Sequence, residues 1–173
     1  MGKIIRPGDL APTNKPIIFI SGTVRGSHGW LDDVEDVLGG RSNPLPVAIN
    51  NFDDRVELHS RFKTKLAWGD HHIRQALKYG LVMFWFAKQT RRARSNQSIH
   101  YDHPYGANAM YELARCLEYR AHHPYTRIVV GCSDEYDRQN AVLERVELSK
   151  TRVKPVVGGL GDVLEETLRL VNQ

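Results

Sequence analysis

The sequence predicts an α/β domain built on a doubly wound, mostly parallel, five-stranded sheet of flavodoxin-like size. Short apolar runs alternate five times with longer segments of helical period, which indicates parallel strands joined by helices that cover both faces of the sheet. Residues 81–86 are apolar throughout, as expected of a central strand that is buried on both faces. A length of 173 residues suits a single domain with one sizeable core.

Each element follows from its own apolar pattern. The predicted strands are residues 17–20, 45–49, 81–86, 127–131 and 153–157, and the first of them ends at Ser21-Gly22. The predicted helices are residues 30–38, 62–79, 109–120, 140–148 and 162–171. In the third helix, apolar residues form a single stripe that is expected to face the core: Met110, Leu113, Ala114 and Leu117.

Two segments fall outside this alternation. Residues 1–16, which include Pro7, Pro12 and Pro16, predict an irregular N-terminal arm, and residues 17–173 predict a single domain. Residues 88–105 are long for a connection between a strand and a helix, which favours a lid. In this fold class the ligand crevice lies beyond the carboxyl ends of the strands. Site residues should therefore come from the loops after the strands and from the first turns of the helices.

Composition narrows the classes of function. The chain is 41% hydrophobic and 25% charged, values typical of a globular protein, and no apolar run is long enough to cross a bilayer. No secretory signal is recognisable near Met1, so a cytoplasmic protein is expected. A net charge of +4 suits anionic substrates but is too small to predict binding to a nucleic-acid polymer. Cys116 and Cys132 are interpreted as small apolar packing residues.

The segment after the first strand is the first candidate for a ligand contact. Residues 21–27 combine two glycines with Ser21, Thr23 and Arg25, so exposed amides, hydroxyls and a guanidinium could hold phosphate or sugar oxygens. The spacing is that of neither a P-loop nor a dinucleotide-binding fingerprint. An ordinary turn explains the same composition equally well.

Carboxylates and histidines in two helices are the next candidates. Glu112 lies off the centre of its apolar stripe and early in its helix, so it could act as a nucleophile or as a general acid or base. Position alone favours a solvated surface charge, the usual state of a glutamate on a helix. Asp70, His71 and His72 invite a metal interpretation, but neighbouring helical residues diverge and no known zinc-ligand spacing follows. A hydrogen bond to substrate or a surface helix face fits them better.

The long connection carries a third group of candidates. Arg91, Arg92 and Arg94 precede His100, Tyr101, Asp102 and His103 in residues 88–105. Arginines beside rings could close over an anionic nucleotide, binding its phosphate and stacking on its base. A solubilising loop that binds no ligand is the alternative.

Taken together, these segments resemble the nucleoside 2-deoxyribosyltransferase-like superfamily, which includes 2′-deoxynucleoside 5′-phosphate N-hydrolases. The resemblance covers about residues 17–170, nearly the whole chain. Residues 19–26 are similar to the first loop of the hydrolases, and residues 84–90 to a strand ending of one transferase-like branch. Residues 110–115 match the segment that holds the family nucleophile. Residues 130–138, followed by Asn140, are similar to the next strand and loop.

The resemblance implies a role for Glu112. It would attack the anomeric carbon of the sugar as the base leaves, forming a covalent glycosyl-enzyme that a second base or water then resolves. It also implies that no metal or organic cofactor is needed, and that the chain forms a homo-oligomer. The implied substrate is a nucleoside or nucleotide, with no nucleic-acid polymer and no membrane as partner.

The sequence departs from the family pattern at two positions, and both affect which residues are expected to assist Glu112. The carboxylate that family members have in the helix before the central strand aligns with His72, and Asp70 lies two residues away. Either Asp70 fills that role after a local shift, or His72 has replaced the carboxylate. Transferases of the family have an aspartate six residues before the nucleophile, where this chain has Gly106. Asp102 is a possible substitute.

The resulting expectation is a nucleoside 2-deoxyribosyltransferase, with Glu112, Asp70 and His72 as candidate catalytic residues. The alternatives are a deoxynucleoside 5′-monophosphate N-glycosidase, a glycosidase of an NAD-type nucleotide, or a nucleotide-binding module without activity. The expected substrate contacts are Ser21, Gly22, Thr23, Arg25, Asn50, Asn51, Asp53, Trp85, Tyr101, Asp102 and Asn108.

Overall fold

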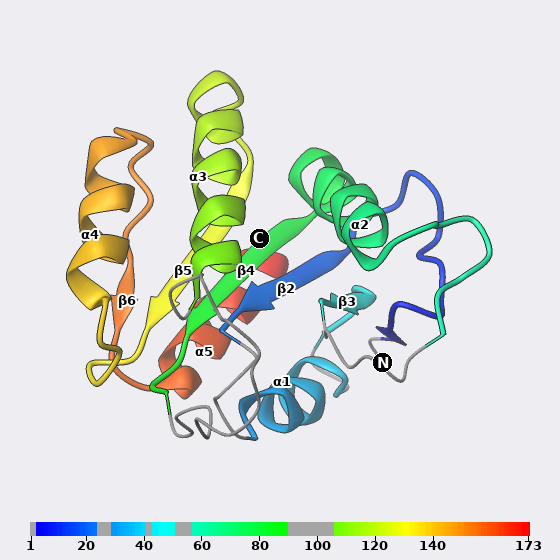
Figure 1. Ribbon diagram of the computed structural model, residues 1–173, viewed down its shortest axis with the longest axis horizontal. Helices are drawn as coiled ribbons and strands as arrows, with labels where there is room; N and C mark the ends of the chain where they lie inside the picture. The colour runs from blue at the N-terminus through cyan, green and yellow to red at the C-terminus, as the bar shows by residue number, and fades with distance from the viewer. Residues whose placement is uncertain (1–2, 24–28, 41–42, 51–56, 90–105) are drawn as a thin grey trace, which may run out of the picture.

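A parallel sheet of six strands forms the centre of the molecule in the computed structural model (Figure 1). The structure describes residues 3–23, 29–40, 43–50, 57–89 and 106–173. The strand order is β1-β3-β2-β4-β5-β6, and every neighbouring pair is parallel. Apart from the edge strand β1, this is the order of a doubly wound, flavodoxin-like sheet, so the predicted fold class is confirmed.

Strands and helices alternate along the chain as the apolar pattern predicts. The strands are β1 (Ile4–Ile5), β2 (Ile18–Gly22), β3 (Val47–Ile49), β4 (Leu81–Phe86), β5 (Arg127–Cys132) and β6 (Val156–Val157). The helices are α1 (Trp30–Leu38), α2 (Lys65–Tyr79), α3 (Ala107–His122), α4 (Gln139–Leu148) and α5 (Leu160–Val171). Among the described residues, no helix has the length and apolar character needed to cross a membrane.

Helices cover both faces of the sheet and create two hydrophobic cores. Figure 1 shows α2, α3 and α4 on one side, and α1 and α5 on the other. The central strand β4 divides its side chains between the cores, because successive residues point to opposite faces. Phe84 and Phe86 pack under α2 and α3, whereas Met83 and Trp85 pack against α1 and α5. This two-sided burial explains why β4 is apolar throughout.

The N-terminal arm is more ordered than its prolines suggest, and here the prediction of five strands is wrong. Ile4 and Ile5 pair with Val47 and Ala48 of β3, which adds a sixth, edge strand. Ile5 is fully buried, but two residues are too few to produce the alternation that identifies a strand in a sequence. The rest of the arm packs along α2, where the indole of Trp68 donates a hydrogen bond to the Asp9 carbonyl at 2.9 Å.

The switch point of the sheet lies between β2 and β4. The chain passes from β2 to β3 on one side and then crosses to β4 on the other, so the loops that leave these strands diverge. The two strands approach closely at Gly22, where a Cβ atom would lie 2.1 Å from the carbonyl oxygen of Trp85. Glycine is therefore required at the point where the crevice opens.

Candidate active site

Glu112 lies at the switch point, on the side of α3 that faces the ends of β2 and β3. The Ser21 hydroxyl, near the end of β2, donates a hydrogen bond to Glu112 Oε2 at 2.5 Å. The Asn50 amide, one residue past β3, donates to Glu112 Oε1 at 3.3 Å. The carboxylate is half-buried and each of its oxygens has a donor from a different strand end. Its orientation is thus fixed by the sheet as well as by its own helix.

The surroundings of Glu112 disfavour its charged form. Burial raises the pKa of the carboxyl above its ordinary value, while the hydrogen bond from Ser21 and the nearby Arg115 act in the opposite direction. The negative charge of Asp70 adds to the upward shift, and the hydrogen bond from Asn50 opposes it. A carboxylate that is fixed at the carboxyl ends of parallel strands, and whose charged form is destabilised by burial, is typical of a functional site.

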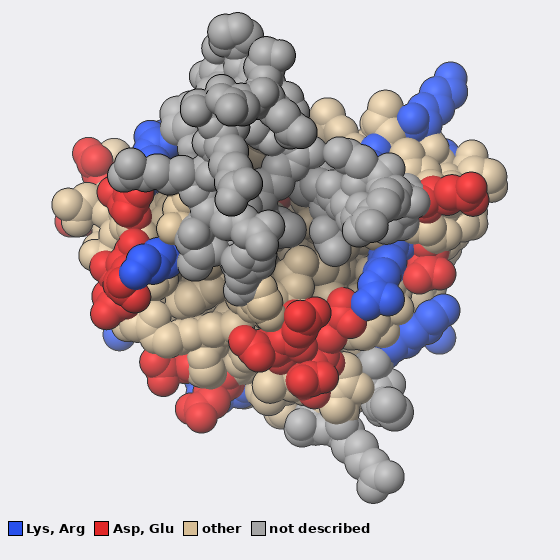
Figure 2. Space-filling view, turned by 60° about the horizontal axis from the view of Figure 1, so that its bottom comes forward, with Lys and Arg blue, Asp and Glu red and all other residues tan. Residues whose placement is uncertain are grey.

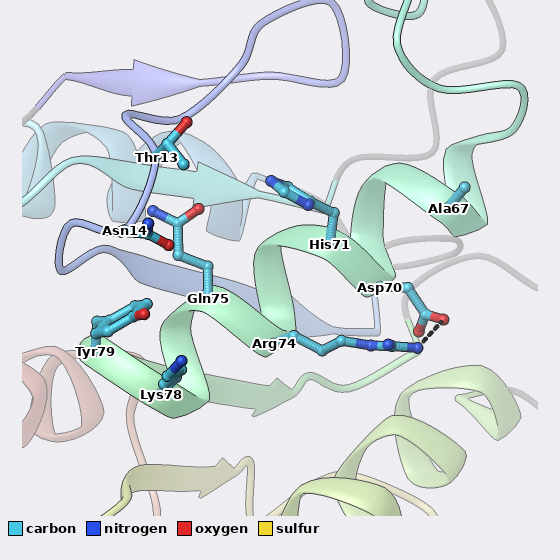
Figure 3. A pocket seen from close by; sticks show the side chains of 9 residues that line it. All are labelled: Thr13, Asn14, Ala67, Asp70, His71, Arg74, Gln75, Lys78 and Tyr79. Carbon is cyan, nitrogen blue, oxygen red and sulfur yellow. Dashed lines mark ion pairs between the residues drawn. The ribbon is translucent and has the colours of Figure 1, made fainter.

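Asp70 belongs to a charged cluster beside Glu112. Arg115 Nη1, from α3, lies 2.8 Å from Asp70 Oδ1 and joins the two helices. Arg74 Nη2, one turn further along α2, lies 3.5 Å from Asp70 Oδ2. Figure 3 shows Asp70 and Arg74 on one side of α2, whereas Gln75 points toward the N-terminal arm. Asp70 therefore faces α3 and Glu112, as expected of a residue that assists the Glu112 carboxylate.

His72, the rival of Asp70, lies in the core between α2 and the arm. Its side chain is fully buried, with Nδ1 2.8 Å from the Trp68 carbonyl oxygen and Nε2 accepting a hydrogen bond from the Ala11 amide at 3.3 Å. These partners require a neutral ring with its proton on Nδ1. Burial lowers the pKa of His72 to about 4, and the positive charge that His71 can carry adds to this effect. Both ring nitrogens are occupied by backbone groups.

Two grooves flank α2. One, of about 290 Å³, runs between α2 and α3, and its lining side chains are Ile73, Arg74, Leu77, Glu112, Arg115, Cys116 and Tyr119. The other, of about 480 Å³, lies on the outer side of α2 against arm residues Thr13 and Asn14, and Figure 3 shows its lining side chains. The first groove is the one in which Glu112 is accessible.

The remaining predicted contacts are placed in different ways. The Thr23 hydroxyl accepts a hydrogen bond from the Ala87 amide at 2.7 Å and holds the ends of β2 and β4 together. Trp85 is buried in the core under α1 and α5, on the face of the sheet opposite α3. Asn108 is exposed in the first turn of α3. The other expected contacts lie outside the described residues: Arg25, Asn51, Asp53, Tyr101 and Asp102.

Gly106 has a structural reason to differ from the aspartate of the family pattern. It precedes α3 with φ of 78°, a conformation that favours glycine. A Cβ atom there would lie 2.5 Å from the Tyr136 hydroxyl and 2.9 Å from Thr23 Cγ2. The space that a longer side chain would need is thus filled by Tyr136 and Thr23.

Arg115 lies beside Glu112 and pairs with Asp70, but the sequence did not predict it as a site residue. It occurs within the motif of residues 110–115, but its partner Asp70 is 45 positions away and on another helix. Opposite charges three residues apart on a helix commonly pair, so the sequence predicts that Arg115 pairs with Glu112 and not with Asp70. Only the packing of α2 against α3 shows the pair that forms.

Within the described part of the chain, no group of three or more metal-ligating side chains is close enough to hold an ion. Figure 2 shows one face of the molecule, on which the Lys and Arg side chains of the described residues lie in a few small groups, with Asp and Glu side chains among them. No family model matches the sequence, and a search of curated proteins finds no similar chain.

Proposed function

We propose that this protein acts on the N-glycosidic bond of nucleosides or their 5′-monophosphates, as a nucleoside 2-deoxyribosyltransferase with Glu112 as nucleophile. The observation that carries the proposal is the carboxylate of Glu112, held at the switch point by Ser21 and Asn50. The resemblance of residues 110–115 to the nucleophile segment of the family supplies the reaction type.

The arrangement suits attack on a sugar carbon. Two hydrogen bonds hold the carboxylate in one orientation, which reduces the entropy that must be lost when the substrate reaches it. Partial burial leaves the carboxylate less solvated than it would be in water, so less water must be displaced before a bond forms. The Ser21 hydroxyl can also turn toward a sugar oxygen once Glu112 has formed its bond to carbon.

The reaction has two steps. A Glu112 oxygen bonds to the anomeric carbon while the carbon–nitrogen bond breaks, and the base leaves with that electron pair and takes up a proton. In the second step the nitrogen of another base attacks the same carbon, gives up its proton to solvent and releases Glu112 as a carboxylate. Attack by water instead of a base would make the same enzyme a hydrolase.

Product analysis separates these outcomes. The protein is incubated with each deoxynucleoside and each 5′-monophosphate, with and without a second free base, and the products are resolved by chromatography. A transferase gives a new nucleoside only when the second base is present. Free base and sugar phosphate without an acceptor would identify the hydrolase instead.

Two variants of α3 connect any activity to Glu112. Glu112→Gln should abolish product formation, whereas Glu118→Gln, at an exposed position of the same helix, should not. A 2′-fluoro arabinonucleoside, whose fluorine slows breakdown of a glycosyl-enzyme, should add one sugar mass to the wild-type protein and none to Glu112→Gln. Unchanged turnover in Glu112→Gln would disprove the nucleophile assignment.

A second candidate function is nucleotide binding without turnover. The specific observation in its favour is the closed space at Gly106, which excludes the aspartate that transferases of the family carry there. Calorimetric titration with nucleoside monophosphates decides between the two functions. Micromolar binding with no product from any substrate would favour the binding module.

A further inference from the structure

The pairing of Arg115 is unexpected for its position. It follows Glu112 by three residues on α3, a spacing at which opposite charges on a helix commonly pair. Its guanidinium lies instead 2.8 Å from Asp70 on the neighbouring helix and 5.7 Å from the centre of the Tyr111 ring. Glu112 is left to two neutral donors, Ser21 and Asn50.

We propose that Asp70 is a positioning residue that holds Arg115 away from Glu112 and so keeps the Glu112 carboxylate available for attack. This inference rests on the proposed function. An arginine paired directly with Glu112 would occupy its lone pairs and stabilise its negative charge, and both effects reduce nucleophilicity. Asp70 competes for the same guanidinium and wins in the structure, at a distance typical of a charge-assisted hydrogen bond.

The groups that face Glu112 come from four elements. α2 contributes Asp70, whose charge acts on Glu112, and Arg74, which lines the same groove as Glu112. α3 contributes Arg115 and the buried thiol of Cys116. The strand ends contribute the uncharged Ser21 and Asn50. Asp70 raises the pKa of Glu112 and Arg115 lowers it, which is the direction expected if the two residues act against each other.

This role differs from the one that the family resemblance implies. There, the carboxylate in the helix before the central strand orients the sugar or the nucleophile by direct contact. If Asp70 contacts the sugar, its loss cannot be repaired by changing Arg115. If Asp70 acts by engaging Arg115, removal of Arg115 should relieve most of the defect.

A double-mutant cycle tests the inference. Asp70→Asn keeps the size of the side chain but removes its charge, and should lower kcat/KM by on the order of 10- to 100-fold as Arg115 turns to Glu112. Asp70→Asn combined with Arg115→Met should recover most of that loss. Asp70→Asn combined with Arg74→Met is the matched control, and should show no recovery because Arg74 is more exposed than Arg115 and its pair with Asp70, at 3.5 Å, is longer.

A titration provides a readout that does not depend on turnover. The Glu112 carboxyl is followed by NMR in protein labelled with ¹³C-glutamate, with Glu112→Gln assigning the signal. Asp70→Asn should lower the Glu112 pKa in the wild-type background and lower it much less when Arg115 is Met. Equal shifts in both backgrounds, or no recovery of kcat/KM in the double variant, would overturn the inference. If no substrate is turned over, the proposed function fails, and the titration alone still decides whether Asp70 controls Arg115.

Discussion

Asp70 and His72 are two residues apart on α2, yet they lie in opposite environments. Asp70 faces α3, where it is partly exposed and paired with two arginines beside Glu112. His72 faces the N-terminal arm, where it is fully buried and bonded to two backbone groups. Side chains two positions apart on an α-helix point about 200° apart around its axis. Asp70 therefore faces the crevice, and His72 faces the core. The side of α2 facing Glu112 therefore serves the proposed chemistry, and the side facing the arm serves stability.

The two sides also differ in their response to acid. Glu112 has a raised pKa, so its native carboxyl binds a proton more tightly than the unfolded chain does. His72 has a lowered pKa, so its native ring binds a proton less tightly. Acidification therefore favours the folded state through Glu112 and disfavours it through His72. Variants of each side should separate these effects.

The largest effect is expected at Glu112. Glu112→Gln should reduce kcat by a factor on the order of 1,000 or more, because the nucleophile is lost. It should also make the protein more stable at pH 7, because a neutral amide does not pay the desolvation cost of a buried carboxylate. Urea unfolding at pH 7 and pH 4 measures the gain, which should shrink at pH 4 as the wild-type carboxyl takes up its proton. A variant less stable than wild type at pH 7 would contradict this account of burial.

His72→Gln should have a smaller effect and act on stability. Loss of the ring contacts and of hydrogen bonds to Trp68 and Ala11 should cost about 1–3 kcal/mol in urea unfolding at pH 7. Turnover per folded molecule should be retained, because both ring nitrogens are engaged by backbone groups on the side of α2 away from Glu112. A loss of kcat comparable to that of Glu112→Gln, in protein that remains folded, would restore His72 as a catalytic candidate.

The same variant should change the acid dependence of stability. The native pKa of His72 is about 4 and its ordinary value is 6.5, so its contribution is fully present above pH 6.5 and is lost as the pH falls toward 4. That interval corresponds to roughly 3 kcal/mol for a single proton. Protonation places a hydrogen on Nε2, where it opposes the Ala11 amide. The slope of stability between pH 6.5 and 4 should be shallower in His72→Gln than in wild type.

The smallest effect is expected at Gly69, which directly precedes Asp70 on α2 and faces the Asn50 side chain. A Cβ atom there would lie 3.6 Å from the Asn50 amide, an ordinary contact, and alanine favours the helix over glycine. Gly69→Ala should therefore raise the free energy of unfolding by about 0.5–1 kcal/mol. Gly69→Val is the matched variant: its added methyl groups should displace Asn50 from Glu112 and lower turnover. Destabilisation by alanine would show that α2 and Asn50 are packed more tightly than these distances indicate.

Much of the fold could be predicted from the sequence because its elements have clear apolar periods. The predicted bounds of α1 and β4 agree with the structure, and those of α4 differ by one residue. β1 was not predicted, because two isoleucines in a proline-containing arm have no period of their own. The sequence predicted the type of sheet but not its strand order, which only the pairings between strands show; β2, for example, pairs with both β3 and β4.

The candidate site could be predicted less completely. Its position followed from the fold class, since residues after parallel strands gather at one edge. The partners of Glu112 did not follow, because Ser21 and Asn50 are 91 and 62 residues away from it. The choice between Asp70 and His72 was also open, since both occur in one polar segment and either could face the crevice.

The apolar pattern of the chain was enough to predict the fold class, the order of the elements and the place of Glu112 early in the helix after the central strand. Each of these predictions rests on the spacing of apolar residues within single helices and strands. The orientation of Asp70 toward Glu112, the bond between His72 and the arm, and the pair between Arg115 and Asp70 could be seen only in the packed molecule. Such pairings depend on which helix faces come together when the two cores close, and distances of 3 Å between side chains are set by that packing.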